Sequence, residues 1–390
     1  MQAYWSIPTL IFYLFLSALG MLYMRKLKSC GNLTIRAFSS KPYVWFLLVF
    51  WTIIATFRYV SLWTGGTDAP DYIDAFVNCH NPNLLDEHTL SDIAFYYYNY
   101  LLRFITSDYH LYFALSYGII AFAFFYFITY FSRKENSVIP FIMVFYLYLR
   151  GFNTLRSNLA IAFLLLSIVM LARSRLKTCF ILLVVSCLTH KMCFVYGLVI
   201  PFLLLFRNRN MNLMMFLLFI VVTYLLAGVF QLWFILFASS QDLGGAYAAY
   251  ASRSLDSETG FAYVTAFGQL LLALFLIVLY RKKLRKESDQ LMRTDHDKRL
   301  HLLTLMCYFD FILIPFSYIM GIWRGDECLF LARITMWSYL INLIFRNKSH
   351  VFRGFGSILV FFLFIAWLVF RFNRTYADSN LMPYLFGPLM

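Results

Sequence analysis

The sequence predicts an all-α polytopic integral membrane protein, and three observations support this prediction. Of 390 residues, 62% are hydrophobic and 13% are charged, which leaves too little polar surface to cover a soluble globule. Of the 33 lysines and arginines, 23 lie in six short loops that alternate with non-basic loops, which is the positive-inside pattern. The acidic residues are biased the other way, with 13 of 19 in the opposite loops. The net charge of +14 therefore indicates membrane orientation, and it is no argument for nucleic-acid binding.

We expect about twelve transmembrane helices in one domain over residues 1–390, with both termini outside and an outward-facing cavity. The predicted spans are 5–23, 43–59, 109–131, 138–150, 157–172, 178–189, 192–206, 211–230, 261–280, 301–320, 328–345 and 355–371. Residues 61–108 and 231–260 form two longer outer loops, and residues 281–299 form a basic cytoplasmic loop that faces anionic headgroups.

The first outer loop contains an amphipathic segment, Ala94–Thr106. Phe95, Tyr98, Leu102 and Ile105 recur at helical spacing along it. We therefore expect a helix that lies flat in the membrane interface before the chain re-enters the membrane at Tyr109.

The middle of the chain contains short apolar segments of roughly 12–16 residues, where a full crossing needs about 20. Short, re-entrant-like helices leave their connecting turns within the thickness of the bilayer. These turns are Arg150–Arg156 and Thr189–Lys191. Ionisable residues at that depth are candidates for function, because irregular polar backbone is tolerated there only inside protein or along a watery cavity.

Several outer-side cations suit a polyanionic ligand, because guanidinium forks match diphosphate oxygens. Arg156 begins a predicted helix at its positive dipole end, which is unfavourable unless an anion joins it. Arg333, five residues into its span, and Lys191 are further candidates for the diphosphate. Among the outer-side residues there is no Asp-x-Asp pair, His-x-x-x-His pair or glycine-rich phosphate loop, so neither a nucleotide nor a metal-bridged diphosphate is indicated.

His190 and Asp68 are the candidate general bases. A lone histidine is also often a structural hydrogen-bonding group, and an aspartate in a turn-prone loop often caps the turn. Asp310, inside an apolar segment, is expected to pair with a neighbouring helix. Candidate sugar-binding residues lie in the two outer loops; they are Tyr72, Tyr247, Tyr250 and Arg253.

At these residues the chain resembles a known family, the EpsG-type membrane polymerases, which are relatives of the Wzy O-antigen polymerases. The resemblance covers nearly the whole chain. It rests on a Gly-x-Asp-x-x-x-Tyr-x-x-x-Phe pattern at Gly66, Asp68, Tyr72 and Phe76, the segment Asp92–Phe104, Arg156–Ala160, His190, Arg333 and Leu381–Tyr384. Ser157 stands where the family commonly has glutamine.

The resemblance implies a metal-independent, cofactor-free glycosyltransferase of GT-C-like architecture in the bacterial cytoplasmic (inner) membrane. Its substrate would be undecaprenyl-diphosphate-linked oligosaccharide, polymerised on the outer face into O-antigen, capsule or exopolysaccharide. Membrane lipid, a chain-length regulator and a flippase are the implied partners, and nucleic acid is not. Two alternatives remain open from the residues: a flippase or transporter of lipid-linked oligosaccharide, and an O-antigen ligase-type glycosyltransferase.

The alternating loop charge makes the topology testable with reporter fusions. Fusions after Lys28, Arg175 and Lys286 should report a cytoplasmic position. Fusions near Asp86 and Asp378 should report an outer position. Reversal of any of the first three would show that the topology is wrong.

Overall fold

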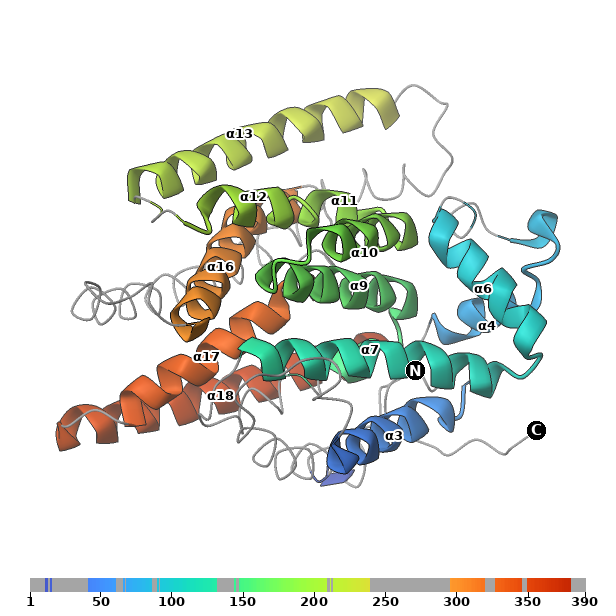
Figure 1. Cartoon of the computed structure of the whole chain (residues 1–390), viewed down its shortest axis with the longest axis horizontal. Helices are drawn as coiled ribbons and strands as arrows, with labels where there is room; N and C mark the ends of the chain where they lie inside the picture. Colours follow the sequence, from blue (N-terminus) through green and yellow to red (C-terminus); the bar gives the residue numbers. More distant parts are fainter. Residues whose placement is uncertain are drawn as a thin grey trace. The chain divides into compact units, whose positions relative to one another are not determined.

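The computed structural model describes residues 41–60, 66, 68–85, 90, 92–131, 144, 147–208, 211, 213–238, 295–319, 327–345 and 349–379, together with 11, 12 and 15. Every regular element in these ranges is helical (Figure 1). The elements are α3 (Pro42–Thr56), α4 (Ala69–Val77), η1 (Pro82–Leu84), α6 (Ile93–Ile105), α7 (Tyr109–Phe131), α9 (Leu155–Ala172), α10 (Leu176–Thr189), α11 (Met192–Tyr196), α12 (Val199–Phe206), α13 (Leu213–Ala238), α16 (Asp295–Ile319), α17 (Phe330–Phe345) and α18 (His350–Ser379).

The apolar runs of the sequence correspond closely to these helices. The predicted span 109–131 has the bounds of α7, and α9 and α10 begin within two residues of their predicted starts. The predicted span 192–206 is divided into α11 and α12. Among the described residues, α7 and α9 are long and apolar enough to cross a membrane, and shorter apolar stretches lie in α3, α10, α11 with α12, α13 and α18. The predicted span 261–280 and most of the spans 5–23 and 138–150 lie outside the described residues.

The chain divides into two compact units, residues 1–194 with 337–390, and residues 195–336. In the first unit α7 packs against α3 and α9, and α10 packs against α9 and α6. Aromatic side chains fill the contact between α3 and α7, where the ring centroids of Trp51 and Phe125 are 4.5 Å apart. The hydroxyl of Tyr148 donates to the Trp51 carbonyl oxygen at 2.8 Å, which joins α3 to the segment before α9.

The junction between α3 and α7 is closed by polar groups. Asp108 precedes α7, and its Oδ1 accepts the backbone N–H of His110 at 2.8 Å, which satisfies a donor in the first turn. The ring of His110 contacts the Thr56 carbonyl oxygen at 2.8 Å through Nδ1, which therefore carries the hydrogen. The end of α3 and the start of α7 are thus held together.

A buried turn before α9 is held from three directions. Arg58, 1% exposed, directs its guanidinium to the Phe152 carbonyl oxygen at 3.5 Å and to the Tyr117 hydroxyl at 3.1 Å. The Tyr117 hydroxyl donates to the Gly151 carbonyl oxygen at 3.1 Å. The rings of Phe113, Tyr117 and Phe152 surround the guanidinium with centroids 4.4, 4.9 and 4.5 Å from it. Arg58 is therefore a structural cation that is buried among aromatic rings.

The loop before α4 docks on the same turn. The backbone N–H of Asp68 donates to Asn153 Oδ1 at 2.7 Å, across 85 residues of chain. Gly66 has a φ of 110°, and a Cβ there would lie 2.8 Å from the Phe152 carbonyl oxygen. Only glycine meets both requirements without strain.

The helix predicted for the membrane interface is α6, and its four periodic apolar residues do not share one environment. Phe95 and Leu102 are buried within the protein, whereas Ile105 is 71% exposed. The exposed apolar face consists of Ile93, Tyr97, Leu101, Phe104 and Ile105. Because α6 is apolar on both sides, periodicity alone does not show which side faces the protein.

In the second unit α16 packs against α12 and α13. Phenylalanine rings fill these contacts. The ring centroids of Phe202 and Phe309 are 5.1 Å apart, and those of Phe216 and Phe311 are 5.2 Å apart. The ring of His301 donates through Nε2 to the Phe206 carbonyl oxygen at 3.1 Å, which satisfies a carbonyl at the end of α12.

The close approach at Gly66 predicts the effect of adding one methyl group. Gly66→Ala should lower the free energy of unfolding by about 2 kcal/mol or more, because it combines a strained φ with a clash against backbone. Thermal unfolding of the detergent-purified protein measures this loss. Gly228→Ala is the control, because a Cβ there meets no atom within 4 Å. Equal stability of the two variants would contradict the docking of the loop on the turn.

Candidate functional site

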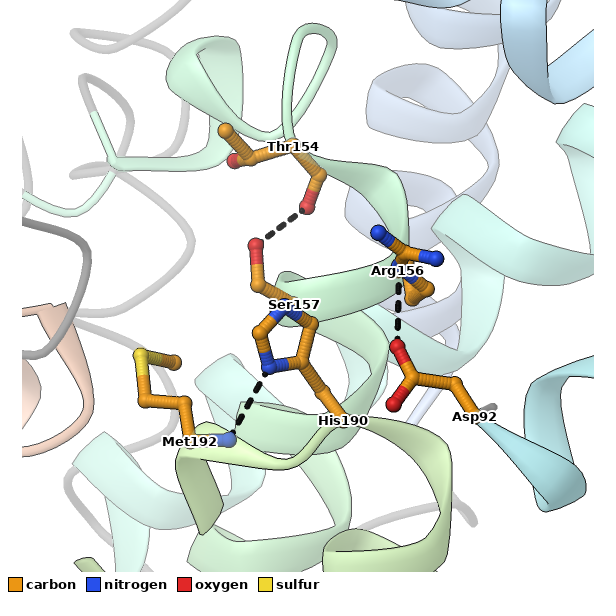
Figure 2. Close-up of polar contacts among 6 residues, drawn as sticks. All are labelled: Asp92, Thr154, Arg156, Ser157, His190 and Met192. Carbon is orange, nitrogen blue, oxygen red and sulfur yellow. Dashed lines mark hydrogen bonds and ion pairs between the residues drawn. The ribbon is translucent and has the colours of Figure 1, made fainter. Parts of the chain in front are cut away.

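The site residues that the sequence predicts in the first unit lie around the first turn of α9. The helices α9 and α10 form an antiparallel hairpin, in which the Ser186 hydroxyl donates to the Ala160 carbonyl oxygen at 2.7 Å. His190 follows four residues later as the C-cap of α10, and Arg156 and Ser157 precede Ala160 by four and three residues, so the hairpin brings the end of α10 to the start of α9 (Figure 2). The pairing of the two helices thus brings together residues that are 34 positions apart in the sequence.

Arg156 is held at one edge of its guanidinium. Its Nε lies 3.2 Å from Oδ2 of Asp92, and its Cζ lies 5.9 Å from the centroid of the Phe95 ring. The side chain of Arg156 is 16% exposed and that of Asp92 is 5% exposed. Figure 2 shows the two terminal nitrogens of Arg156 beyond the edge that Asp92 contacts. Because guanidinium binds phosphate through such a pair of nitrogens, this geometry leaves Arg156 suited to an anion.

The backbone at the start of α9 adds to the positive character of the turn. Thr154 precedes the helix, but its hydroxyl makes no capping hydrogen bond to it. The hydroxyl instead donates to the Arg150 carbonyl oxygen at 3.2 Å and accepts from Asn158 Nδ2 at 2.6 Å. The first-turn N–H groups therefore have no side-chain cap from Thr154, and an uncapped helix N-terminus attracts an anion.

His190 uses one ring nitrogen within its own turn. Its Nδ1 accepts the backbone N–H of Met192 at 3.2 Å (Figure 2). A nitrogen that accepts a hydrogen bond carries no proton, so the neutral ring holds its hydrogen on Nε2. In this form Nε2 is a donor, which suits a hydroxyl or phosphate oxygen. His190 also ends α10, since its N–H donates to the Ser186 carbonyl oxygen at 3.2 Å.

The remaining predicted residues of this unit lie around the same turn. Asp68 is partly exposed, on the loop that docks on Asn153. Tyr72, 7% exposed, meets the Phe95 ring edge to face at 6.1 Å, and Phe95 in turn lies beside Arg156. Lys191 is exposed next to His190.

Arg333 lies in the second unit, in the first turn of α17, and is also paired with a carboxylate. Its Nε is 2.6 Å from Oδ2 of Asp310 on α16, which confirms the prediction that Asp310 pairs with a neighbouring helix. The guanidinium of Arg333 lies 5.3 Å from the centroid of the Phe330 ring. The exposed fractions are 13% for Arg333 and 1% for Asp310.

The buried face of α6, which begins at Asp92 beside Arg156, carries polar residues that were not predicted from the sequence. Asp92 is one of them, and Asn99, 0% exposed, is another. Within the described part of the chain, neither side-chain amide atom of Asn99 has a hydrogen-bond partner, and nor does the Tyr112 hydroxyl. Asp92, Phe95, Asn99 and Leu102 recur at helical spacing, a signal that would have placed them on one buried face.

Tyr98 on the same helix is a stable hydrogen-bonding group. Its hydroxyl lies 2.8 Å from that of Ser116 on α7. Burial raises the pKa of Tyr98 to about 12, and the hydrogen bond with Ser116 opposes the rise. The phenol therefore stays protonated at neutral pH and fastens α6 to α7.

The candidate sugar-binding residues Tyr247, Tyr250 and Arg253 lie outside the described residues, as does most of the basic loop 281–299. In the ranges that the structure describes, no group of three histidine, cysteine, aspartate or glutamate side chains is arranged to hold a metal ion.

Residues 41–386 match a family model described as the EpsG family. This region includes the α9 turn, Asp92, His190 and Arg333. No curated protein and no solved structure matches the chain.

Proposed function

The chain belongs to the EpsG family, a Wzy-like polysaccharide polymerase family, and on this basis we propose that it joins undecaprenyl-diphosphate-linked oligosaccharide repeat units. A hydroxyl oxygen of the acceptor sugar bonds to the anomeric carbon of the growing chain. The bond from that carbon to the diphosphate oxygen breaks, the lipid diphosphate leaves, and the hydroxyl proton passes to a base. The reaction takes place on the outer face of the bacterial cytoplasmic membrane.

The observation that carries the proposal is the cationic turn at the start of α9. A leaving diphosphate needs fixed positive charge in a place with little water. Arg156 supplies a guanidinium with its terminal nitrogens beyond the Asp92 contact, and the uncapped N-terminus of an 18-residue helix adds its dipole. Lys191, beside His190, is a further cation for the diphosphate.

Asp68 and His190 are the proposed acid–base residues at the acceptor hydroxyl. The Nδ1 contact with Met192 favours His190 as the hydrogen-bond donor, because Nε2 then carries the hydrogen. Asp68, on a loop that docks three residues before Arg156, is then the better candidate for the base. Tyr72 offers an aromatic ring to the sugar.

Further parts of the proposal concern the rest of the chain. Arg333 is a proposed diphosphate ligand, and Tyr247, Tyr250 and Arg253 are proposed sugar-binding residues. The membrane domain is proposed to have about twelve spans, both termini outside and a GT-C-like architecture. No metal is required, because cationic side chains can stabilise the leaving group. A chain-length regulator and a flippase are the proposed protein partners.

The polysaccharide profile of a deletion strain tests the function. A strain that makes single capped repeats without the polymer ladder has lost a polymerase. A strain that makes no surface polymer at all has lost a flippase or a ligase, and that result would overturn the proposal.

Complementation of the same strain tests the arginines. Arg156→Ala and Arg333→Ala should abolish the ladder while the protein accumulates normally. Arg156→Lys should rescue little, because a point charge replaces a planar fork and loses bidentate contact. Full activity of Arg156→Lys would show that charge alone is sufficient, and full activity of Arg156→Ala would place the diphosphate elsewhere.

Two substitutions separate the donor and base roles of His190. His190→Gln places an amide near the position of Nε2, whereas His190→Asn places one near Nδ1 and preserves the acceptor for Met192. If His190 donates, His190→Gln should retain about a tenth or more of the polymerisation rate, because its amide N–H still donates. Asp68→Asn should then be nearly inactive.

The rate of polymer synthesis by purified protein, measured across pH, decides between the roles. A loss of at least 100-fold in His190→Gln, together with loss of the acidic limb of the pH profile, would instead make His190 the base. Near-normal rates in both His190→Gln and Asp68→Asn would exclude both residues.

A further inference from the structure

Asp92 holds the cation that the proposed function assigns to the diphosphate, and its position suggests a role of its own. We propose that Asp92 is a displaceable stand-in for phosphate oxygens: its carboxylate occupies Arg156 in the empty enzyme and moves to the N-terminus of its own helix, α6, when a lipid diphosphate binds. This role rests on the proposed polymerase function and goes beyond it, because it makes Asp92 a positioning residue that regulates binding and release.

The first supporting observation is the geometry of the ion pair. The Nε of Arg156 and Oδ2 of Asp92 are 3.2 Å apart, whereas charge-assisted pairs typically lie at about 2.7–2.9 Å. Asp92 contacts Arg156 at Nε, so one edge of the guanidinium is occupied. In the second unit, by contrast, Arg333 and Asp310 are 2.6 Å apart. The contact of Asp92 with Arg156 is thus the longer of the two, which fits a partner that is exchanged.

The second observation is that Asp92 stands at a capping position without capping. It is the N-cap residue of α6, and aspartate is among the preferred residues there. Its side chain nevertheless makes no capping hydrogen bond to the helix. An N-cap carboxylate accepts from backbone N–H groups two or three residues ahead, here those of Ala94 and Phe95. The carboxylate is therefore turned toward Arg156 and away from the N–H groups it would otherwise cap.

These two facts describe two alternative places for one buried negative charge. A carboxylate that is 5% exposed needs a partner in either state. Arg156 provides one partner, and the positive end of the α6 dipole provides the other within the reach of a side-chain rotation. Both places favour the ionised carboxylate, so displacement does not leave a buried charge uncompensated.

The exchange would matter most after the reaction. The leaving lipid diphosphate carries more negative charge than the glycosylated donor, so a fixed arginine would hold the product more tightly than the substrate. Return of Asp92 to Arg156 competes with the product and speeds its release. An enzyme without this competitor should bind diphosphate more tightly and turn over more slowly.

Binding of farnesyl diphosphate to the full-length purified protein tests the proposal. Asp92→Asn removes the charge, and Asp74→Asn, an exposed aspartate of α4 in the same outer loop, is the control with the same change in net charge. We expect Asp92→Asn to bind about tenfold more tightly than wild type, and Asp74→Asn to bind as wild type does. Asp92→Ser, which retains a capping oxygen, should show the same tightening and serves if the asparagine variant folds poorly.

Kinetics provide a second readout that a purely structural role would not produce. In Asp92→Asn and Asp92→Ser the first turnover should be retained while steady-state turnover falls about fivefold or more, with a lower KM. Unchanged or weaker diphosphate binding in these variants, relative to Asp74→Asn, would overturn the role of Asp92.

Arg156→Ala tests the proposed diphosphate site separately from the role of Asp92. If it binds the probe as wild type does, the proposed diphosphate site fails. If it loses binding while the Asp92 variants gain none, the proposed site stands and the role of Asp92 alone fails.

Discussion

The candidate site depends on one requirement, that the backbone carbonyls of the buried turn before α9 be satisfied. An unsatisfied buried carbonyl costs about 1–3 kcal/mol. Arg58, which follows α3, donates to the Phe152 carbonyl oxygen. The hydroxyl of Tyr117, on α7, donates to the Gly151 carbonyl oxygen. The turn is thereby fixed, and with it the first residue of α9. Arg156 takes its position from this framework, since it is the second residue of the helix.

The helices were largely predictable because their signal is local. A continuous apolar run bounded by polar residues defined α7 to the residue, and Asp108 marks its start in sequence and structure alike. The orientation of α6 was less predictable, because both of its sides are apolar and only tertiary packing distinguishes them. Phe95 and Leu102 face the protein, whereas Leu101 and Phe104 are exposed.

The site was predictable only in part, for a related reason. A cation at a helix N-terminus is locally anomalous, which identified Arg156 from sequence alone. Its partner could not be identified in the same way, because Asp92 lies 64 positions earlier and an acidic residue in an outer loop is unremarkable by itself. The surroundings of Arg58 were not predictable from sequence either. Its three aromatic neighbours come from α7 and the buried turn, so the sequence around Arg58 contains no sign of the cage.

The two arginine–aspartate pairs show how one motif can serve different ends. In each, a buried carboxylate contacts Nε of an arginine that retains some exposure. Asp310 lies within α16, where the neighbouring N–H groups are used by the helix itself, and its carboxylate pairs with Arg333. Asp92 begins its helix, and the N–H groups of that first turn can receive its charge. Position along a helix therefore separates an ion pair that must persist from one that can exchange.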